Sequence, residues 1–311
     1  MEDYFESLVT LEPSKFPSQP AGRDSLIIGR CQRTEGGKRL FVAMMLGISF
    51  CSTVFAQNGA PTDSSGKEAL EDKQEVDANP GRPTVSTPAT LTPAGYLQLE
   101  TGVLGAERSP EFANRTGNQA DLKLSLSRRF ELILQTEPMV LSDLGNRKDS
   151  EPGEVFAGLQ AVVHHGEGSN PTIAVSYIRR LYASPAPELD IGTNRQSGLL
   201  LASFDLSKFH VDTNAIVTEQ IDDRGVVHRA QFGQTLSISH PVFHQLALSG
   251  ELWHFSQPFL RSNAAGLLIA PSWTVNRHLV LDGGVNRGLT STSTRWEVFA
   301  GFTYLLPKRL W

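Results

Sequence analysis

From about residue 94 onward, apolar and polar side chains alternate along the chain with a period of two. In the stretch ADLKLSLS, Leu122, Leu124 and Leu126 fall on one side of an extended strand, whereas Lys123 and Ser125 fall on the other. Successive side chains of a β-strand point to opposite faces, so this pattern predicts strands with one apolar and one polar face. The segments are about 10 to 13 residues long, which is the length of a tilted strand that crosses an outer membrane.

There are about twelve such segments, and an even number places both ends of a bacterial barrel on the same side of the membrane. Short and long connections alternate between them, as periplasmic turns and external loops do in such barrels. The expected strands cover about residues 94–105, 118–128, 129–139, 153–165, 171–182, 196–207, 208–219, 228–239, 242–255, 263–274, 277–287 and 293–305. The predicted fold is therefore all-β: a transmembrane antiparallel up-and-down β-barrel over residues 94–311.

A soluble β-sandwich or a barrel of the lipocalin type would show the same alternation, with its apolar face turned inward. The alternation alone does not distinguish the inner face from the outer one. After residue 57 the chain has no run of about 18 apolar residues, so no membrane-spanning helix is predicted there. The rhythm of the connections and an export signal together favour the membrane barrel.

The export signal covers residues 38–56, with the sequence KRLFVAMMLGISFCSTVFA. A basic pair is followed by a short apolar core and then by small residues, with Val54 and Ala56 at the positions that signal peptidase reads. Cleavage is predicted after Ala56, so that the mature chain starts at Gln57. Because residues 1–37 do not resemble an export n-region, residues 1–56 are predicted to be a signal peptide with an over-extended N-terminus.

Residues 57–93 are rich in Pro, Ser, Thr, Gly and acidic residues and poor in large apolar groups. This composition predicts a disordered leader in the periplasm. Both cysteines, Cys31 and Cys51, precede the predicted cleavage site, so no disulfide or thiolate metal site is expected in the mature chain. The formal net charge of −5 argues against a nucleic-acid-binding protein.

Charged side chains on the polar face are the candidates for a functional lining of the barrel. In a narrow barrel, opposite charges could instead pair across the lumen and serve the structure alone. No cofactor is expected, and the neighbours His164 and His165 point to opposite faces of a strand, so no metal site is predicted. The predicted lining residues are Lys123, Glu131, Glu137, Glu251, Asp282, Arg295 and Glu297.

Aromatic residues gather near the ends of the predicted strands, where interfacial girdles of a membrane barrel are expected. They are Tyr96, Phe130, Tyr177, Tyr182, Phe209, Trp253, Phe255, Trp273, Trp296, Tyr304 and Trp311. The run His254–Phe255–Ser256, with Asn263 opening the next strand, resembles the His-x-Ser pair and neighbouring Asn of outer-membrane phospholipases, which are also twelve-stranded barrels. A lipid hydrolase is therefore an alternative function, and a non-conducting structural or binding barrel is another.

The closing stretch LVLDGGVNRGLTSTSTRWEVFAGFTYLL resembles the end of the outer-membrane family of the MetA pathway of phenol degradation. The resemblance extends over about residues 94–311, and the features that carry it are Asp282, Gly284, Gly288, Trp296, Gly301 and Tyr304. It implies a bacterial outer-membrane barrel that passes or binds small hydrophobic or aromatic compounds. The partners expected of such a barrel are outer-membrane lipids and the barrel assembly machinery.

Overall fold

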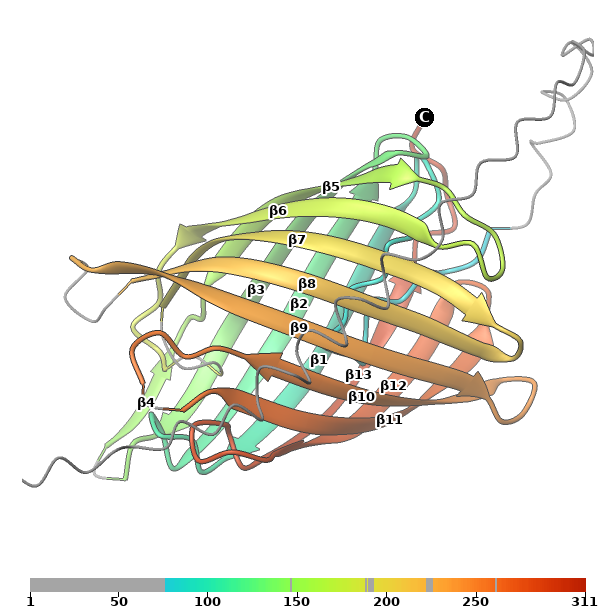
Figure 1. Ribbon diagram of the computed structural model, residues 1–311. Coiled ribbons are helices and arrows are strands. Elements are labelled where there is room, and N and C mark those ends of the chain that lie inside the picture. Colours follow the sequence, from blue (N-terminus) through green and yellow to red (C-terminus); the bar gives the residue numbers. More distant parts are fainter. Residues whose placement is uncertain (1–75, 146, 188, 190–192, 222–225, 261) are drawn as a thin grey trace, which may run out of the picture. The chain divides into compact units, whose positions relative to one another are not determined.

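The computed structural model describes residues 76–311 except 146, 188, 190–192, 222–225 and 261. The described chain is folded into strands joined by turns and loops (Figure 1). Within it, no helix is long and apolar enough to cross a membrane. The strands are β1 (Leu97–Glu107), β2 (Asn114–Ser125), β3 (Phe130–Asp143), β4 (Lys148–Glu151), β5 (Val155–His164), β6 (Thr172–Tyr182), β7 (Thr193–Leu206), β8 (Phe209–Ile221), β9 (His228–Pro241), β10 (Leu246–Phe255), β11 (Ala264–Asn276), β12 (Leu279–Gly288) and β13 (Trp296–Leu305).

Apart from β4, each described strand pairs with an antiparallel neighbour on both sides, and the sheet closes through the pairing of β1 with β13 and of β2 with β3. β4 pairs with the end of β3 at Val140–Asp143, on the side where β5 pairs with the earlier part of β3. The other 12 of the 13 strands form a closed up-and-down barrel, which confirms the predicted fold. The sequence analysis did not predict β4, a polar strand of four residues.

The structure shows which face of the strands points outward. Large apolar side chains such as Leu132, Leu252 and Val298 are exposed by 44%, 54% and 59%, whereas Gln98 and Glu251 are exposed by 0% and 1%. A barrel in water places its apolar face inside, because burial of that face drives folding. Here the apolar side chains form the outer surface and the polar ones face the lumen, so the barrel is built to span a membrane.

Residues 76–93, which we call the luminal segment, enter the barrel and leave it again at the end that carries the short turns. The N–H of Ala78 donates to the carbonyl of Arg277 in the β11–β12 turn at 2.7 Å. The N–H of Thr87 donates to Asn214 Oδ1 on β8 at 2.7 Å, and the N–H of Thr92 donates to Glu131 Oε2 on β3 at 2.8 Å. The segment therefore runs around the inside of the wall.

The expectation of a disordered leader over residues 57–93 does not hold for residues 76–93. The segment has few apolar groups to bury, as its composition indicates, but its backbone finds hydrogen-bond partners on the polar inner wall. Residues 57–75 and the predicted signal peptide, residues 1–56, lie outside the described residues.

Candidate functional site

Glu251 of β10 holds the middle of the luminal segment. Its Oε2 accepts a hydrogen bond from the N–H of Val85, and its Oε1 accepts from the N–H and the hydroxyl of Ser86, each at 2.6 Å. Ser86 Oγ also lies 2.8 Å from Oγ1 of Thr235 on β9. A buried carboxylate is costly unless it is hydrogen-bonded, and Glu251 satisfies this requirement through the segment.

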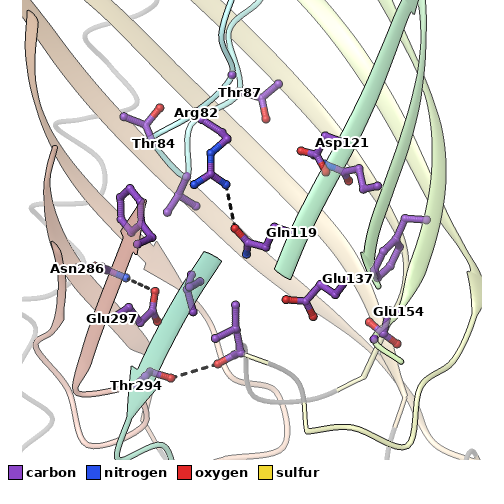
Figure 2. A pocket seen from close by; sticks show the side chains of 18 of the residues that line it. Arg82, Thr84, Thr87, Gln119, Asp121, Glu137, Glu154, Asn286, Thr294 and Glu297 are labelled. Atoms are coloured by element: carbon purple, nitrogen blue, oxygen red, sulfur yellow. Dashed lines mark hydrogen bonds between the residues drawn. The ribbon is translucent and has the colours of Figure 1, made fainter. Parts of the chain in front are cut away.

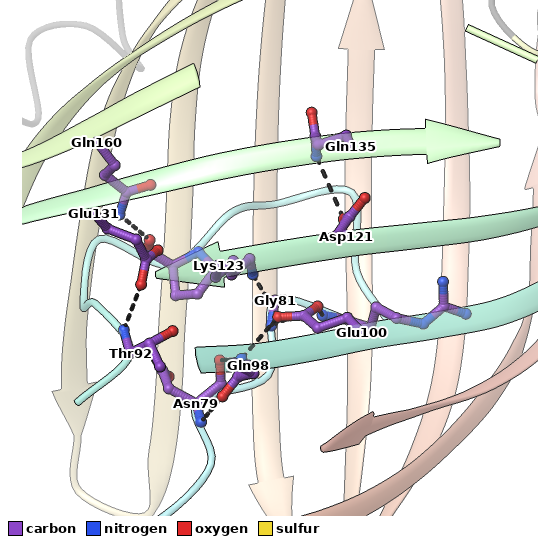
Figure 3. A network of polar contacts seen from close by, with 12 residues as sticks. Asn79, Gly81, Thr92, Gln98, Glu100, Asp121, Lys123, Glu131, Gln135 and Gln160 are labelled. Atoms are coloured by element: carbon purple, nitrogen blue, oxygen red, sulfur yellow. Dashed lines mark hydrogen bonds and ion pairs between the residues drawn. The ribbon is translucent and has the colours of Figure 1, made fainter. Parts of the chain in front are cut away.

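Glu100 of β1 holds the first part of the segment (Figure 3). It accepts from the N–H groups of Gly81 and Arg82 at 3.0 and 3.1 Å, and Lys123 Nζ lies 2.5 Å from its Oε1. A Cβ on Gly81 would lie 2.4 Å from Lys123 Nζ, so the segment approaches the wall closely at this residue. The Gly81 backbone can therefore reach Glu100 while Lys123 neutralises that carboxylate.

Arg82 of the luminal segment places its guanidinium against the inner wall, over Gly102 of β1 and Gly301 of β13. Its Nε lies 3.3 Å from Asp282 Oδ1 on β12, and its Nη1 donates to Gln119 Oε1 on β2 at 3.0 Å. Near the segment's end, Glu131 accepts from Thr92 N and from Ser125 Oγ at 2.7 Å. Wall residues from several strands thus bind a single short stretch of chain.

A cavity of about 450 Å³ lies beside the luminal segment. Gly81–Val85 and Thr87 line one side of it, and Ser184, Ala186, Pro187 and Leu189 of the β6–β7 loop also line it. Arg115 Nε of β2 donates to the carbonyl of Pro187 at 2.8 Å, and the hydroxyl of Thr294 donates to the carbonyl of Leu189 at 3.2 Å. Because β5, β3, β2 and β1 lie between β6 and β13, a loop after β6 that contacts Thr294 beside β13 reaches over the lumen.

Two groups of cavity-lining residues differ in chemistry. We call Asp121 of β2, Glu137 of β3 and Glu154, which precedes β5, the acidic wall. We call Trp253 and Phe255 of β10 and Phe299 of β13 the aromatic wall. Figure 2 shows the three acidic residues on the side opposite Asn286 and Glu297.

Each ring of the aromatic wall lies against a glycine on the neighbouring strand. Trp253 pairs with Gly266, Phe255 with Gly233, and Phe299 with Gly284. A Cβ at these glycines would lie 2.2, 2.4 and 2.6 Å from the respective rings. The rings can therefore lie along the wall instead of filling the lumen, and the cavity persists between them and the acidic wall.

Trp253 is also held by a hydrogen bond. Its Nε1 donates to Asn286 Oδ1 at 2.9 Å, and Asn286 Nδ2 donates to Glu297 Oε2 at 3.0 Å. The sequence analysis placed Trp253 and Phe255 in an interfacial girdle. This prediction was wrong, because both side chains line the cavity. Both share the strand parity of Glu251, and that parity points inward.

Most charges at the cavity are paired. Arg115 pairs with Glu137, Lys123 pairs with Glu100, and Arg180 Nη1 lies 2.8 Å from Glu154 Oε1. Burial raises the pKa of Glu154, and the hydrogen bond and positive charge of Arg180 oppose this shift. Asp121 accepts a hydrogen bond of 3.4 Å from Gln135 and forms no ion pair within the described part of the chain.

The structure divides the seven predicted lining residues into three groups. Lys123, Glu137 and Glu297 line the cavity. Glu131, Glu251 and Asp282 bind the luminal segment. Arg295 lies in the connection before β13 and is exposed, so the structure does not bring it into the lumen.

Sequence reasoning missed several residues of the site, chiefly Arg82, Arg115, Asp121 and Glu154. Asp121 has the parity of Lys123, so the alternation contained the signal for it. Arg82 lies in a stretch whose composition predicts disorder, and no local pattern reports its place in the lumen.

The residues of the hydrolase alternative come together only in part. His254 Nε2 and Asn263 Nδ2 lie 3.1 Å apart. Ser256 Oγ, however, accepts a hydrogen bond of 2.8 Å from the N–H of Phe232, and among the described residues it has no hydrogen bond with His254. The described residues contain no group of three or more His, Cys, Asp or Glu placed to hold a metal ion.

No protein-family model matches the chain, and no match to a curated protein was found. Among solved structures, a NanC porin is similar at 7% identity and a TM-score of 0.48, over 66% of this chain and 98% of that one. An anion-selective porin from Comamonas acidovorans is similar at 8% identity and a TM-score of 0.36, over 68% and 98% of the two chains. The CymD monoaromatic hydrocarbon channel is similar at 9% identity and a TM-score of 0.38, over 68% and 88%. These similarities are to porins and channels, at a level that carries no information on the solute.

Proposed function

We propose that the protein is a channel of the bacterial outer membrane for small solutes, with a lumen that residues 76–93 restrict. The observation that supports this proposal is a closed barrel, apolar outside and polar inside, that encloses a cavity of about 450 Å³. Outer-membrane barrels have this inverted polarity. The predicted export signal and the alternation of short and long connections support the same location.

We further propose a relationship to the outer-membrane family of the MetA pathway of phenol degradation, whose closing-strand pattern this chain resembles. Two residues of that pattern contribute to the lumen: Asp282 binds Arg82, and Gly284 makes room for Phe299. The aromatic wall supports the proposal that the solute has a hydrophobic or aromatic part. The hydrolase alternative has less support, because Ser256 is not hydrogen-bonded to the histidine that would activate it.

The channel is tested by tethering the luminal segment to the wall. Ser86 Oγ and Thr235 Oγ1 lie 2.8 Å apart, which brings the two side chains within reach of a disulfide after Ser86→Cys and Thr235→Cys. In the expected mature chain both natural cysteines, Cys31 and Cys51, are absent. We expect the wild type to show small conductance in planar bilayers, the oxidised double variant to show much less, and reduction to restore it.

The two single-cysteine variants are the matched controls, and the conductance of each should be the same before and after treatment with the oxidant. Silent bilayers with the wild type and the reduced double variant would contradict the channel and favour a non-conducting barrel. Equal conductance of the oxidised and reduced double variant would contradict a restriction that depends on movement of the segment.

A further inference from the structure

We propose that the cavity is a binding site for small organic amines, with the ammonium group at the acidic wall and the apolar body against the aromatic wall. This inference rests on the proposed function, because it names the class of solute that the lumen selects.

The charges that line the cavity favour a cation. They comprise five carboxylates, at Glu100, Asp121, Glu137, Glu154 and Glu297, and three cations, at Arg82, Arg115 and Lys123. Each cation already has a carboxylate partner, and Arg82 is paired with Asp282, which is not part of the lining. An anionic solute would therefore meet an excess of negative charge, whereas an ammonium group would be attracted.

Asp121 is the best-placed ligand for the ammonium group. It lines the cavity and has no ion-pair partner in the described part of the chain, and its hydrogen bond from Gln135, at 3.4 Å, is long. Figure 2 shows it beside Glu137 on the same wall. An ammonium group would supply the positive charge that this carboxylate lacks.

Two further acceptors and one donor, Arg115 Nη1, of the cavity-lining residues have no hydrogen-bond partner in the described part of the chain. Glu137 Oε1 and Ser176 Oγ are buried and form no hydrogen bond within the described residues, and Ser176 is only 5% exposed. Leaving a buried acceptor without a donor is costly. A primary ammonium group carries three N–H donors and no acceptor, so it matches a wall that offers acceptors.

The aromatic wall fits the rest of such a molecule. Trp253, Phe255 and Phe299 lie flat against glycines, and Leu104 and Leu268 line the same side of the cavity. Apolar surface of this kind binds a ring or a short alkyl chain, and ring faces attract a nearby cation as well. A cavity of about 450 Å³ is large enough for a one-ring ligand.

Trp253 supplies a reporter for the test. The chain has 4 tryptophans, and Trp273, Trp296 and Trp311 are exposed by 54%, 41% and 55%. Replacing these three with Phe leaves Trp253, at the cavity, as the sole tryptophan. Fluorescence of this protein is then titrated with 2-phenylethylamine, 2-phenylethanol and phenylacetate, which share a ring and differ in the head group.

We expect a saturable fluorescence change with the amine, binding at least about tenfold weaker with the alcohol, and none with the carboxylate. Asp121→Asn, which removes the charge and keeps the shape, should weaken amine binding by about tenfold or more, the factor that corresponds to the loss of one charge-assisted contact. It should leave binding of the alcohol unchanged. The control is Asp149→Asn on β4, where the carboxylate pairs with Arg147 and does not line the cavity.

Equal binding of the three probes, or amine binding that Asp121→Asn and Asp149→Asn affect alike, would overturn the amine site. The result is independent of conductance. Amine binding in a protein that is silent in bilayers would overturn the channel and leave the site, whereas conductance without amine binding would overturn the site and leave the channel.

Discussion

Single carboxylates decide how the lumen is filled. Glu251 is 1% exposed, and its charge is compensated by N–H and O–H groups of the luminal segment rather than by a basic side chain. Hydrogen bonds to a charged acceptor are about twice as strong as neutral ones. Glu251 is therefore the residue whose neutralisation should loosen the segment most directly.

The Glu251→Gln variant tests this role. Loss of the charge weakens the hydrogen bonds to Val85 and Ser86 by about 1.5 kcal/mol or more in total, which raises the population of the released segment at least about tenfold. In a Val85→Cys background, maleimide labelling should accelerate by that factor. Glu107→Gln, at the exposed end of β1, is the control and should leave the labelling rate unchanged. Equal labelling rates of Val85→Cys with and without Glu251→Gln would rule out Glu251 as an anchor of the segment.

Pairs of neighbouring strands shape the cavity. β10 contributes two rings, and β11 and β9 contribute the glycines against which those rings lie. Adding a methyl group at such a glycine forces the ring away from the wall, because the space is already filled. The β6–β7 loop bounds the same space from across the barrel through its contacts with Arg115 and Thr294.

Gly266→Ala should destabilise the barrel by about 1–3 kcal/mol, the usual cost of overpacking. The new Cβ would lie 2.2 Å from Cζ2 of Trp253. Gly250→Ala on β10 is the matched control: its Cβ meets no atom within 4 Å, and its effect should stay within about 0.5 kcal/mol. Urea unfolding in lipid vesicles measures the free energy of unfolding of both variants. Equal stability of the two variants would show that Trp253 does not depend on the space over Gly266.

The whole molecule is organised by the membrane. Its outer surface presents large apolar side chains, and its polar groups are used inside, by the luminal segment and by the cavity. This arrangement is stable only where lipid covers the outside. Membrane insertion is therefore a property of the entire barrel rather than of one strand.

The mature protein is expected to start at Gln57 and to sediment with outer membranes. Val54 and Ala56 fit the signal-peptidase rule, and the barrel cannot leave its apolar surface in water. Intact-mass measurement and N-terminal sequencing of the purified protein check the cleavage, and membrane fractionation checks the location. A mature chain that retains residues before 50, or a protein recovered in the soluble fraction, would contradict these expectations.

The sequence by itself determined the barrel. Period-two alternation depends on the geometry of a single strand, so the strand pattern and the place of Glu131, Glu251 and Asp282 on the polar face could be predicted locally. The sequence also places Trp253 on the same face as Glu251, although its position near a strand end suggested an interfacial girdle. Arg295 has inward parity but lies in a connection, where the alternation no longer applies.

Only the tertiary structure decided which face lies in the lumen, that residues 76–93 enter it, and that the acidic and aromatic walls face each other. The luminal segment has too few apolar groups to order itself, and its hydrogen-bond partners come from strands up to 200 positions away in the chain, as in the pairing of Arg82 with Asp282. Contacts of this kind exist only once the barrel has closed. For this reason no local pattern could reveal them.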